Sequence, residues 1–294
     1  RSERFFISGS SDNSLKIEGC RFENCVGCCC YLSVESESLD SIQINDCTFD
    51  SCKKINYKTV AVGASQTSDS ISLTVDNCQF NNCGQGQSEV YIFYWEVNKA
   101  ANDGGELTFN NNKFHSDSLD QACVAFRILQ EGKRVTFHNC SFDNSPNSKS
   151  SPWETTISAN RLSNIDIDQC TFTECGHGGN VIVIESGVSK STIQNSTIEF
   201  ASSNQCASGI SSYIDNIALI GNRIFRCNEN SIRIQCKENN DQFQLIENYF
   251  TGCNNGYIIG IYGKFSQEPI IRGNTFEKNQ NLWKVSFDIK CNSN

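Results

Sequence analysis

Short segments with apolar residues at every second position recur along the chain. The first six cover residues 15–17, 42–44, 73–75, 107–109, 135–137 and 165–167. This alternation indicates strands with one buried face. Each segment precedes a phrase such as CTFDSC, which begins at Cys47, and a further apolar segment such as VIVIES, which begins at Val181. No stretch has a convincing helical periodicity, so each unit is predicted to contain three short strands.

The phrase that contains cysteine and phenylalanine is itself repeated. Clear copies begin at Cys20, Cys47, Cys78 and Cys170, and weaker copies begin at Asn112, Cys140, Ser196, Asn222, Asn248 and Asn274. Successive copies lie 26 to 34 residues apart. A period in this range, kept over ten copies, is typical of a solenoid. We therefore predict an all-β, right-handed parallel β-helix of about ten coils, with three short strands per coil, as a single domain over residues 1–294.

A leucine-rich repeat is the main alternative, because it also has short repeats with Asn or Cys at a turn. That fold requires a dense pattern of leucines and often a helix in each repeat. Leucine is sparse here, and the second alternating segment of each unit has no place in that fold. The periodicity therefore favours the β-helix.

Stacked coils lie about 4.8 Å apart, so equivalent residues should form columns along the molecule. One predicted column is an inward stack of phenylalanines that includes Phe22, Phe49, Phe80, Phe142 and Phe172. Another contains Cys20, Cys47, Cys78, Cys140 and Cys170, with Asn or Ser in the remaining coils. We expect Asn to form a hydrogen-bonded ladder, and Cys to fill the same corner as a small buried hydrophobe.

Disulfides are the alternative for these cysteines. The two cysteines of a phrase do not occur together throughout, since Cys140 is matched by Ser145 and Cys227 by Asn222. Bonds between neighbouring coils remain allowed by distance, but stacked thiols are favoured. Better disulfide candidates lie outside the columns: Cys28, Cys29, Cys30, Cys123, Cys206, Cys236 and Cys291. Cysteines in lines do not converge on a tetrahedral zinc ion, so no metal site is predicted.

Composition favours a secreted or cell-surface location. The chain has 18 cysteines in 294 residues, and acceptor sequons for N-glycosylation begin at Asn139 and Asn195. The net charge of −9 would repel a phosphate backbone, so no nucleic-acid partner is expected. No apolar run approaches the roughly 20 residues of a membrane helix, so we expect no membrane span in this segment.

Two short motifs carry a resemblance to known proteins. Phe276 begins an F-x-x-N motif, and residues 178–181 nearly match a G-G-A-aliphatic tetrad. An F-x-x-C motif begins at Phe22, Phe49, Phe80 and Phe172. On these motifs the chain resembles the pectin-lyase-like β-helix superfamily, and more closely the polymorphic-membrane-protein repeats of chlamydial and trichomonad surface proteins. The resemblance covers the whole chain and implies a role in adhesion or display.

The same superfamily includes polysaccharide lyases and hydrolases, so the resemblance also allows an active site. Asp166 and Asp168 are predicted to point outward from one strand, and His138 should occupy the row of Asp168 one coil earlier. These side chains form a candidate acid–base group for a sugar acid, with Ca²⁺ held by the aspartates. The alternative is an ordinary solvated polar row.

Aromatic residues are concentrated in VYIFYWEV, residues 90–97. Strand alternation should send some of them outward, which makes Tyr91, Phe93 and Trp95 candidates for binding sugar rings or protein partners. The alternative is that the following loop covers them.

Both ends of the chain look like parts of further coils, without the atypical cap of a finished solenoid. We expect a fragment of a longer solenoid that continues in the chain or by end-to-end stacking with other copies. The predicted function is a non-catalytic extracellular stalk, fibre or adhesin without a cofactor, whose partners are such copies and host or matrix glycans. A carbohydrate-active enzyme and a carbohydrate-binding module remain the alternatives.

Overall fold

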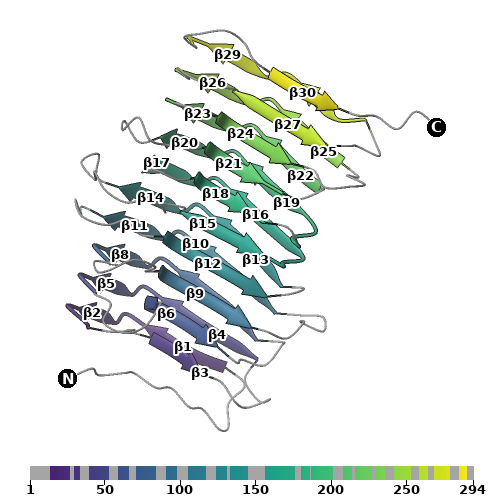
Figure 1. Ribbon diagram of the computed structural model, residues 1–294. Helices are drawn as coiled ribbons and strands as arrows, with labels where there is room; N and C mark the ends of the chain where they lie inside the picture. The colour runs from purple at the N-terminus through teal and green to yellow at the C-terminus, as the bar shows by residue number, and fades with distance from the viewer. Residues whose placement is uncertain are drawn as a thin grey trace.

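In the computed structural model, the described residues form strands and turns and contain no helix (Figure 1). The structure describes residues 14–26, 30–33, 40–52, 59–65, 71–83, 91–97, 105–116, 124–130, 133–144, 156–175, 180–185, 187–200, 208–213, 216–226, 230–235, 242–252, 258–263, 268–278 and 285–289. Within these ranges, no helix is long and apolar enough to cross a membrane.

The strands form three parallel sheets of ten strands each, and each coil contributes one strand to every sheet. Sheet 1 contains β1 (Ser14–Glu18), β4 (Ser41–Asn45), β7 (Ser72–Asp76), β10 (Glu106–Asn110), β13 (Arg134–His138), β16 (Asn164–Asp168), β19 (Ser191–Gln194), β22 (Asn216–Ile220), β25 (Gln242–Ile246) and β28 (Ile270–Arg272). Sheet 2 contains β2 (Arg21–Glu23), β5 (Thr48–Asp50), β8 (Gln79–Asn81), β11 (Lys113–Ser116), β14 (Ser141–Asn144), β17 (Thr171–Cys175), β20 (Thr197–Phe200), β23 (Arg223–Phe225), β26 (Tyr249–Thr251) and β29 (Thr275–Glu277). Sheet 3 contains β3 (Cys30–Ser33), β6 (Thr59–Ser65), β9 (Tyr91–Val97), β12 (Val124–Gln130), β15 (Ile157–Asn160), β18 (Asn180–Ile184), β21 (Ser208–Ser212), β24 (Asn230–Gln235), β27 (Ile259–Gly263) and β30 (Val285–Ile289).

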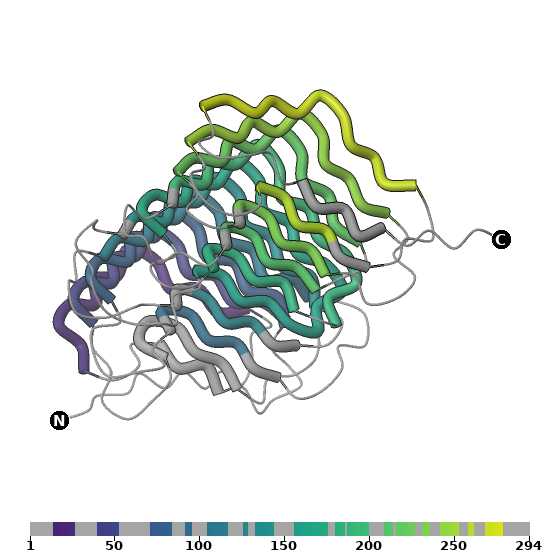
Figure 2. Tube along the Cα trace, turned by 45° about the horizontal axis from the view of Figure 1, so that its top comes forward, coloured from purple at the N-terminus to yellow at the C-terminus, as the bar shows by residue number. Residues whose placement is uncertain are grey.

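The coils follow one another along a single axis, as Figure 2 shows, so residues one repeat apart become neighbours. In sheet 1, Ile44 lies opposite Ile17 on one side and Val75 on the other. Ile42 and Ile44 are completely buried, while Gln43 between them is exposed. The β-helix and its alternating sheet-1 strands are therefore confirmed.

A two-residue turn joins sheets 1 and 2, and its first residue has a positive φ in every coil. The φ values lie between 51° and 66°. The turn residues are Gly19, Asp46, Asn77, Asn111, Asn139, Gln169, Asn195, Gly221, Glu247 and Gly273. Gly, Asn and Asp predominate because they tolerate this left-handed conformation best. The second residue of each turn belongs to the predicted column of cysteine, asparagine and serine residues, which is called the Cys/Asn column below.

The predicted phenylalanine column is present in sheet 2. Adjacent rings from Phe22 through Phe49, Phe80, Phe114 and Phe142 to Phe172 stack with centroids 4.7–4.8 Å apart. Their planes are tilted by no more than 12° from one coil to the next. Stacking of aromatic rings adds to the stability that burial alone provides.

Candidate functional site

The Cys/Asn column is a hydrogen-bonded ladder in which both residue types perform the same task. The Nδ2 of Asn112 donates to the carbonyl of Val75 in the preceding coil, at 2.8 Å. The thiol of Cys78 donates to the equivalent carbonyl of Ile44, at 3.4 Å. Cysteine is therefore more than the hydrophobic filler that the sequence alone had indicated at this corner.

The same side chains also accept a hydrogen bond from the preceding coil. The backbone N–H of Cys78 donates to Oδ1 of Asn112 at 2.9 Å, and the N–H of Cys47 donates to Sγ of Cys78 at 3.4 Å. Later in the chain, the N–H of Asn222 donates to Oδ1 of Asn248 at 3.0 Å. Sulfur is a weak acceptor and S–H a weak donor, so the thiols retain the pattern with weaker bonds.

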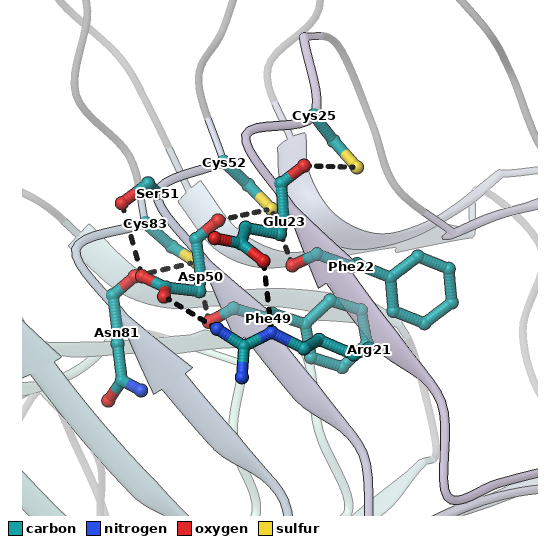
Figure 3. A network of polar contacts seen from close by, with 10 residues as sticks. All are labelled: Arg21, Phe22, Glu23, Cys25, Phe49, Asp50, Ser51, Cys52, Asn81 and Cys83. Atoms are coloured by element: carbon teal, nitrogen blue, oxygen red, sulfur yellow. Dashed lines mark hydrogen bonds and ion pairs between the residues drawn. The ribbon is translucent and has the colours of Figure 1, made fainter.

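The second cysteine of each phrase forms a parallel column at the end of sheet 2. Figure 3 shows the thiol of Cys52 directed at the carbonyl of Phe22, at 3.6 Å, and that of Cys83 at the carbonyl of Phe49, at 3.5 Å. Cys175 donates to Phe142 at 3.6 Å. Each bond joins one coil to the coil before it.

The nine cysteines that the structure describes in the two columns carry free thiols. Burial raises the pKa of Cys78 and of Cys175 from 9.0 to about 12. Burial also raises the pKa of Cys47. Neutral thiols are poor nucleophiles and poor metal ligands, so these three cysteines are chemically inert. The side chains of the disulfide candidates outside the columns lie beyond the described residues.

Sheet 1 brings the predicted acid–base residues together on its outward face. Thr136 lies opposite Asp166, and His138 lies opposite Asp168, in the register expected from the repeat. The Nδ1 of His138 is 3.3 Å from Oδ2 of Asp168. The Nδ2 of Asn195, one coil further on, donates to the other carboxylate oxygen at 3.0 Å.

Asp166 has partners that the sequence analysis did not identify. The Nη2 of Arg134 is 3.3 Å from Oδ2 of Asp166, and Nδ2 of Asn164 donates to the same oxygen at 2.6 Å. Arg134 also approaches Oε1 of Glu106 at 3.5 Å. Arg134 is 32 residues from Asp166 in sequence, too far for a comparison of neighbouring charges along the chain to find it. The register of β13 against β16 would have identified this contact.

A second His–Asp pair lies on sheet 2. His115 is opposite Asp143, and its Nδ1 is 3.2 Å from Oδ2 of Asp143. The same signal, a histidine one coil before an aspartate in the same column, would have identified this pair from the sequence. Its presence shows that a His–Asp contact in this solenoid is not confined to one site. Cross-strand pairs of this type also stabilise a sheet without any catalytic role.

The His138 and Asp168 pair is open to solvent on the sheet face. Their side chains are 43% and 22% exposed. An imidazole and a carboxylate in contact can exchange a proton and can hydrogen-bond sugar hydroxyls. The donors Arg134 and Asn164 both contact Oδ2 of Asp166. Within the described residues, no group of three or more His, Cys, Asp or Glu side chains is arranged to hold a metal ion.

The two glycosylation candidates occupy equivalent places in the fold. Asn139 and Asn195 both lie at the positive-φ position of the turn between sheets 1 and 2, with exposed side chains. The Nδ2 of Asn139 donates to Oδ1 of Asn111 at 2.8 Å. Both side chains therefore belong to the polar corner of the solenoid, where a glycan would project from the turn.

The aromatic segment in β9 lies differently from the expectation. Phe93 and Trp95 are 3% and 0% exposed. They point inward, as do their partners in β12, Phe126 and Ile128, which are also core residues. Both rings are therefore unavailable for surface binding, and Tyr94 is the half-buried aromatic residue between them. The side chain of Tyr91 lies outside the described residues.

Lys133 is a buried residue that the sequence analysis did not single out. Its side chain is fully buried, and its Nζ donates to the carbonyl of Ile71 and lies 5.9 Å from the centre of the Trp95 ring. A cation–π contact of this type stabilises a charge that is removed from water. Lys133 therefore helps to fix Trp95 within the core.

Comparison with known proteins gave no match to any protein-family model, curated protein or solved structure. The pairing of the strands defines the architecture. The chain is a parallel β-helix, consistent with a pectin-lyase-like fold.

Proposed function

We propose that this chain is a non-catalytic extracellular or cell-surface β-solenoid that acts as a structural stalk, fibre or adhesin. One observation carries the proposal: the reactive side chains, which are the column thiols and the Asp168 carboxylate, form contacts with neighbouring coils. The column thiols donate to backbone carbonyls, and Asp168 contacts His138 on one side and accepts a hydrogen bond from Asn195 on the other. Such residues stabilise a rod, and a rod presents its outward faces along its length.

The extracellular location is supported by composition and by the turn geometry. Asn139 and Asn195 project from one corner of the solenoid, where attached glycans would not disturb the core. The resemblance of the F-x-x-C and F-x-x-N motifs to polymorphic-membrane-protein repeats supports adhesion or display. Burial with a raised pKa would also protect thiols such as Cys78 from oxidation outside the cell.

The second candidate is a carbohydrate-active enzyme of the lyase or hydrolase type. It is favoured by the contact between His138 and Asp168 and by Arg134, which lies beside Asp166 and offers a cation for a substrate carboxylate. The recurrence of the pairing at His115 and Asp143 favours the structural interpretation instead.

A screen for sugar release from acidic polysaccharides separates the two functions. The wild-type chain is compared with Asp168→Asn and with a matched control, Asp143→Asn, which alters the other His–Asp pair. We expect no sugar release from any of the three proteins. Release that is lost in Asp168→Asn but retained in Asp143→Asn would contradict the proposed function and establish the enzyme.

A further inference from the structure

Two thiols meet at adjacent levels of the Cys/Asn column near the middle of the solenoid. Strands β14 and β17 pair in register, so Cys140 and Cys170, which directly precede them, are stacked on each other. Both side chains are buried, with 2% and 1% exposure, and their thiols hydrogen-bond each other. The level before the pair holds Asn112, and the level after it holds Ser196. The pair is therefore a set of two sulfurs bounded by other residue types within the column.

The step between these two coils fits an ion between the sulfurs better than it fits a disulfide. The rings of Phe142 and Phe172, two residues after each cysteine, are 4.8 Å apart. A disulfide needs Cβ atoms about 3.5–4.5 Å apart and side chains that converge, whereas stacked side chains of neighbouring parallel strands point the same way. Two metal–sulfur bonds of about 2.3 Å, the length found in zinc thiolates, span about 4.6 Å when they lie in line. A linear sulfur–metal–sulfur unit along the solenoid axis therefore matches this step.

N–H groups surround the two sulfur atoms. The backbone N–H of Asn112 donates to Sγ of Cys140, and Nδ2 of Asn112 is 3.9 Å from the same sulfur. The backbone N–H of Cys140 donates in turn to Sγ of Cys170. Such donors stabilise negative charge on sulfur, and hydrogen bonds to the sulfurs tune metal–thiolate centres. The corner can therefore hold two thiolates that share one cation.

We propose that Cys140 and Cys170 bind one soft monovalent ion of the Cu(I) class in a linear, two-coordinate site. Thiolate is a ligand that selects Cu(I), and this ion, with its filled d shell, accepts two ligands in line. When it binds, two S–H bonds break, two Cu–S bonds form, and both protons pass to solvent without a change in oxidation state. The S–H hydrogen bonds to the carbonyls of Phe109 and Asp168, now 3.3 and 3.4 Å long, are given up.

The same geometry does not suit zinc, which takes four converging ligands in structural sites. Across the part of the chain that the structure describes, no three His, Cys, Asp or Glu side chains are grouped to hold a metal ion. A pair of sulfurs in line therefore selects by coordination number as well as by the softness of the ligand. The proposed site goes beyond the stalk role, which uses the outer faces of the solenoid.

The test is a titration with Cu(I) under argon. Accessible thiols are first blocked by alkylation of the folded chain, which is then unfolded and refolded with Cu(I), because the ion reaches a buried pair only when the coils open. Competition with a coloured Cu(I) chelator measures the bound ion. We expect the wild-type chain to hold one equivalent more than Cys140→Asn or Cys170→Ser. These variants copy Asn112 and Ser196 of the neighbouring levels, so the column should accommodate them.

Cys175→Ser is the matched control. Cys175 is a buried column thiol that has Phe200, and not a cysteine, opposite it in the next coil. This variant should bind as much Cu(I) as the wild-type chain, and circular dichroism verifies that each protein has refolded. Equal Cu(I) content in all four proteins, or a loss that Cys175→Ser shares, would overturn the site.

X-ray absorption at one equivalent of Cu(I) gives the number of ligands directly. We expect two sulfur neighbours, and three or more would overturn the linear site. Asn112→Val should keep both sulfurs but bind about ten-fold more weakly, because outer hydrogen-bond donors contribute to metal affinity. Zn(II) should bind equally to the wild-type chain and to Cys170→Ser. A Zn(II) equivalent lost in Cys170→Ser would contradict a site that selects for two ligands in line.

Discussion

The Oδ1 of Asn112 accepts the backbone N–H of Cys78 at 2.9 Å, across the space between two coils. Cys78 serves its own neighbour in the same way, because its Sγ accepts the N–H of Cys47 at 3.4 Å. An amide and a thiol thus satisfy the same buried backbone groups at successive levels of one column. The exchange of Cys and Asn along the repeat follows from this shared hydrogen-bonding role.

The first prediction concerns replacement within this column. Asn112→Cys should lower the free energy of unfolding by about 1 kcal/mol or less, because the thiol retains both bonds in weaker form. Asn112→Val should lower it by about 2–4 kcal/mol, because the N–H of Cys78 and the carbonyl of Val75 each lose a buried hydrogen bond. Urea unfolding followed by circular dichroism measures both values. Equal losses for the two variants would show that the column only fills space.

The second prediction concerns alkaline pH. The pKa of Cys78 rises from 9.0 in an open chain to about 12 in the folded protein. Above pH 9 the unfolded chain therefore releases a proton that the folded chain retains. Stability should be constant with respect to this group below pH 9 and fall between about pH 9 and pH 12, by roughly 1.4 kcal/mol per pH unit.

Urea unfolding at a series of alkaline pH values measures this slope. Cys78→Asn, which copies the residue found at the next level of the column, should reduce the slope. Cys175 has a pKa of about 12 as well, so part of the slope should remain. An unchanged slope in Cys78→Asn would mean that this thiol does not titrate on unfolding.

The third prediction concerns the phenylalanine stack. Ile198 and Ile224 occupy the same column and are buried, so a branched aliphatic side chain fits there. Phe80→Ile should lower the unfolding free energy by about 1–2 kcal/mol, and Phe80→Ala by about 3–5 kcal/mol. Thermal and urea unfolding of both variants should rank them in this order. Similar small losses for both would imply that the stacked rings contribute little.

The fourth prediction concerns β9. Trp95→Ala should destabilise the fold by about 3–5 kcal/mol, because it empties a fully buried site. Tyr94→Ala should change stability by less than about 1 kcal/mol, because Tyr94 is half-buried on the outward side. Unfolding experiments give both numbers. A Trp95→Ala protein of full stability would show that this ring is not in the core.

The sequence was sufficient to predict the columns, because in stacked coils the equivalent residues of successive repeats lie in direct contact. His138 and Asp168 were placed side by side on this basis, and the register confirms the placement. The phase of β9 was not predictable, because Ile92 and Phe93 are both buried and interrupt the alternation. The register of β6 against β9 also shifts between Thr59 and Val62.

The roles of individual polar groups were harder to predict than the fold. The donor and acceptor roles of the Cys78 sulfur depend on the direction of the backbone groups that surround it. The contact of Arg134 with Asp166 depends on which strands are neighbours. Both become evident only when the coils are superposed in register.

The central claim is that the column cysteines are free thiols that hold one coil to the next. The most direct test is to unfold the protein in denaturant without reductant, alkylate it, and map the labelled cysteines by mass spectrometry. We predict a label on each of the nine described column residues: Cys20, Cys25, Cys47, Cys52, Cys78, Cys83, Cys140, Cys170 and Cys175. Peptides joined by a disulfide between coils, such as Cys47 to Cys78, would contradict the account.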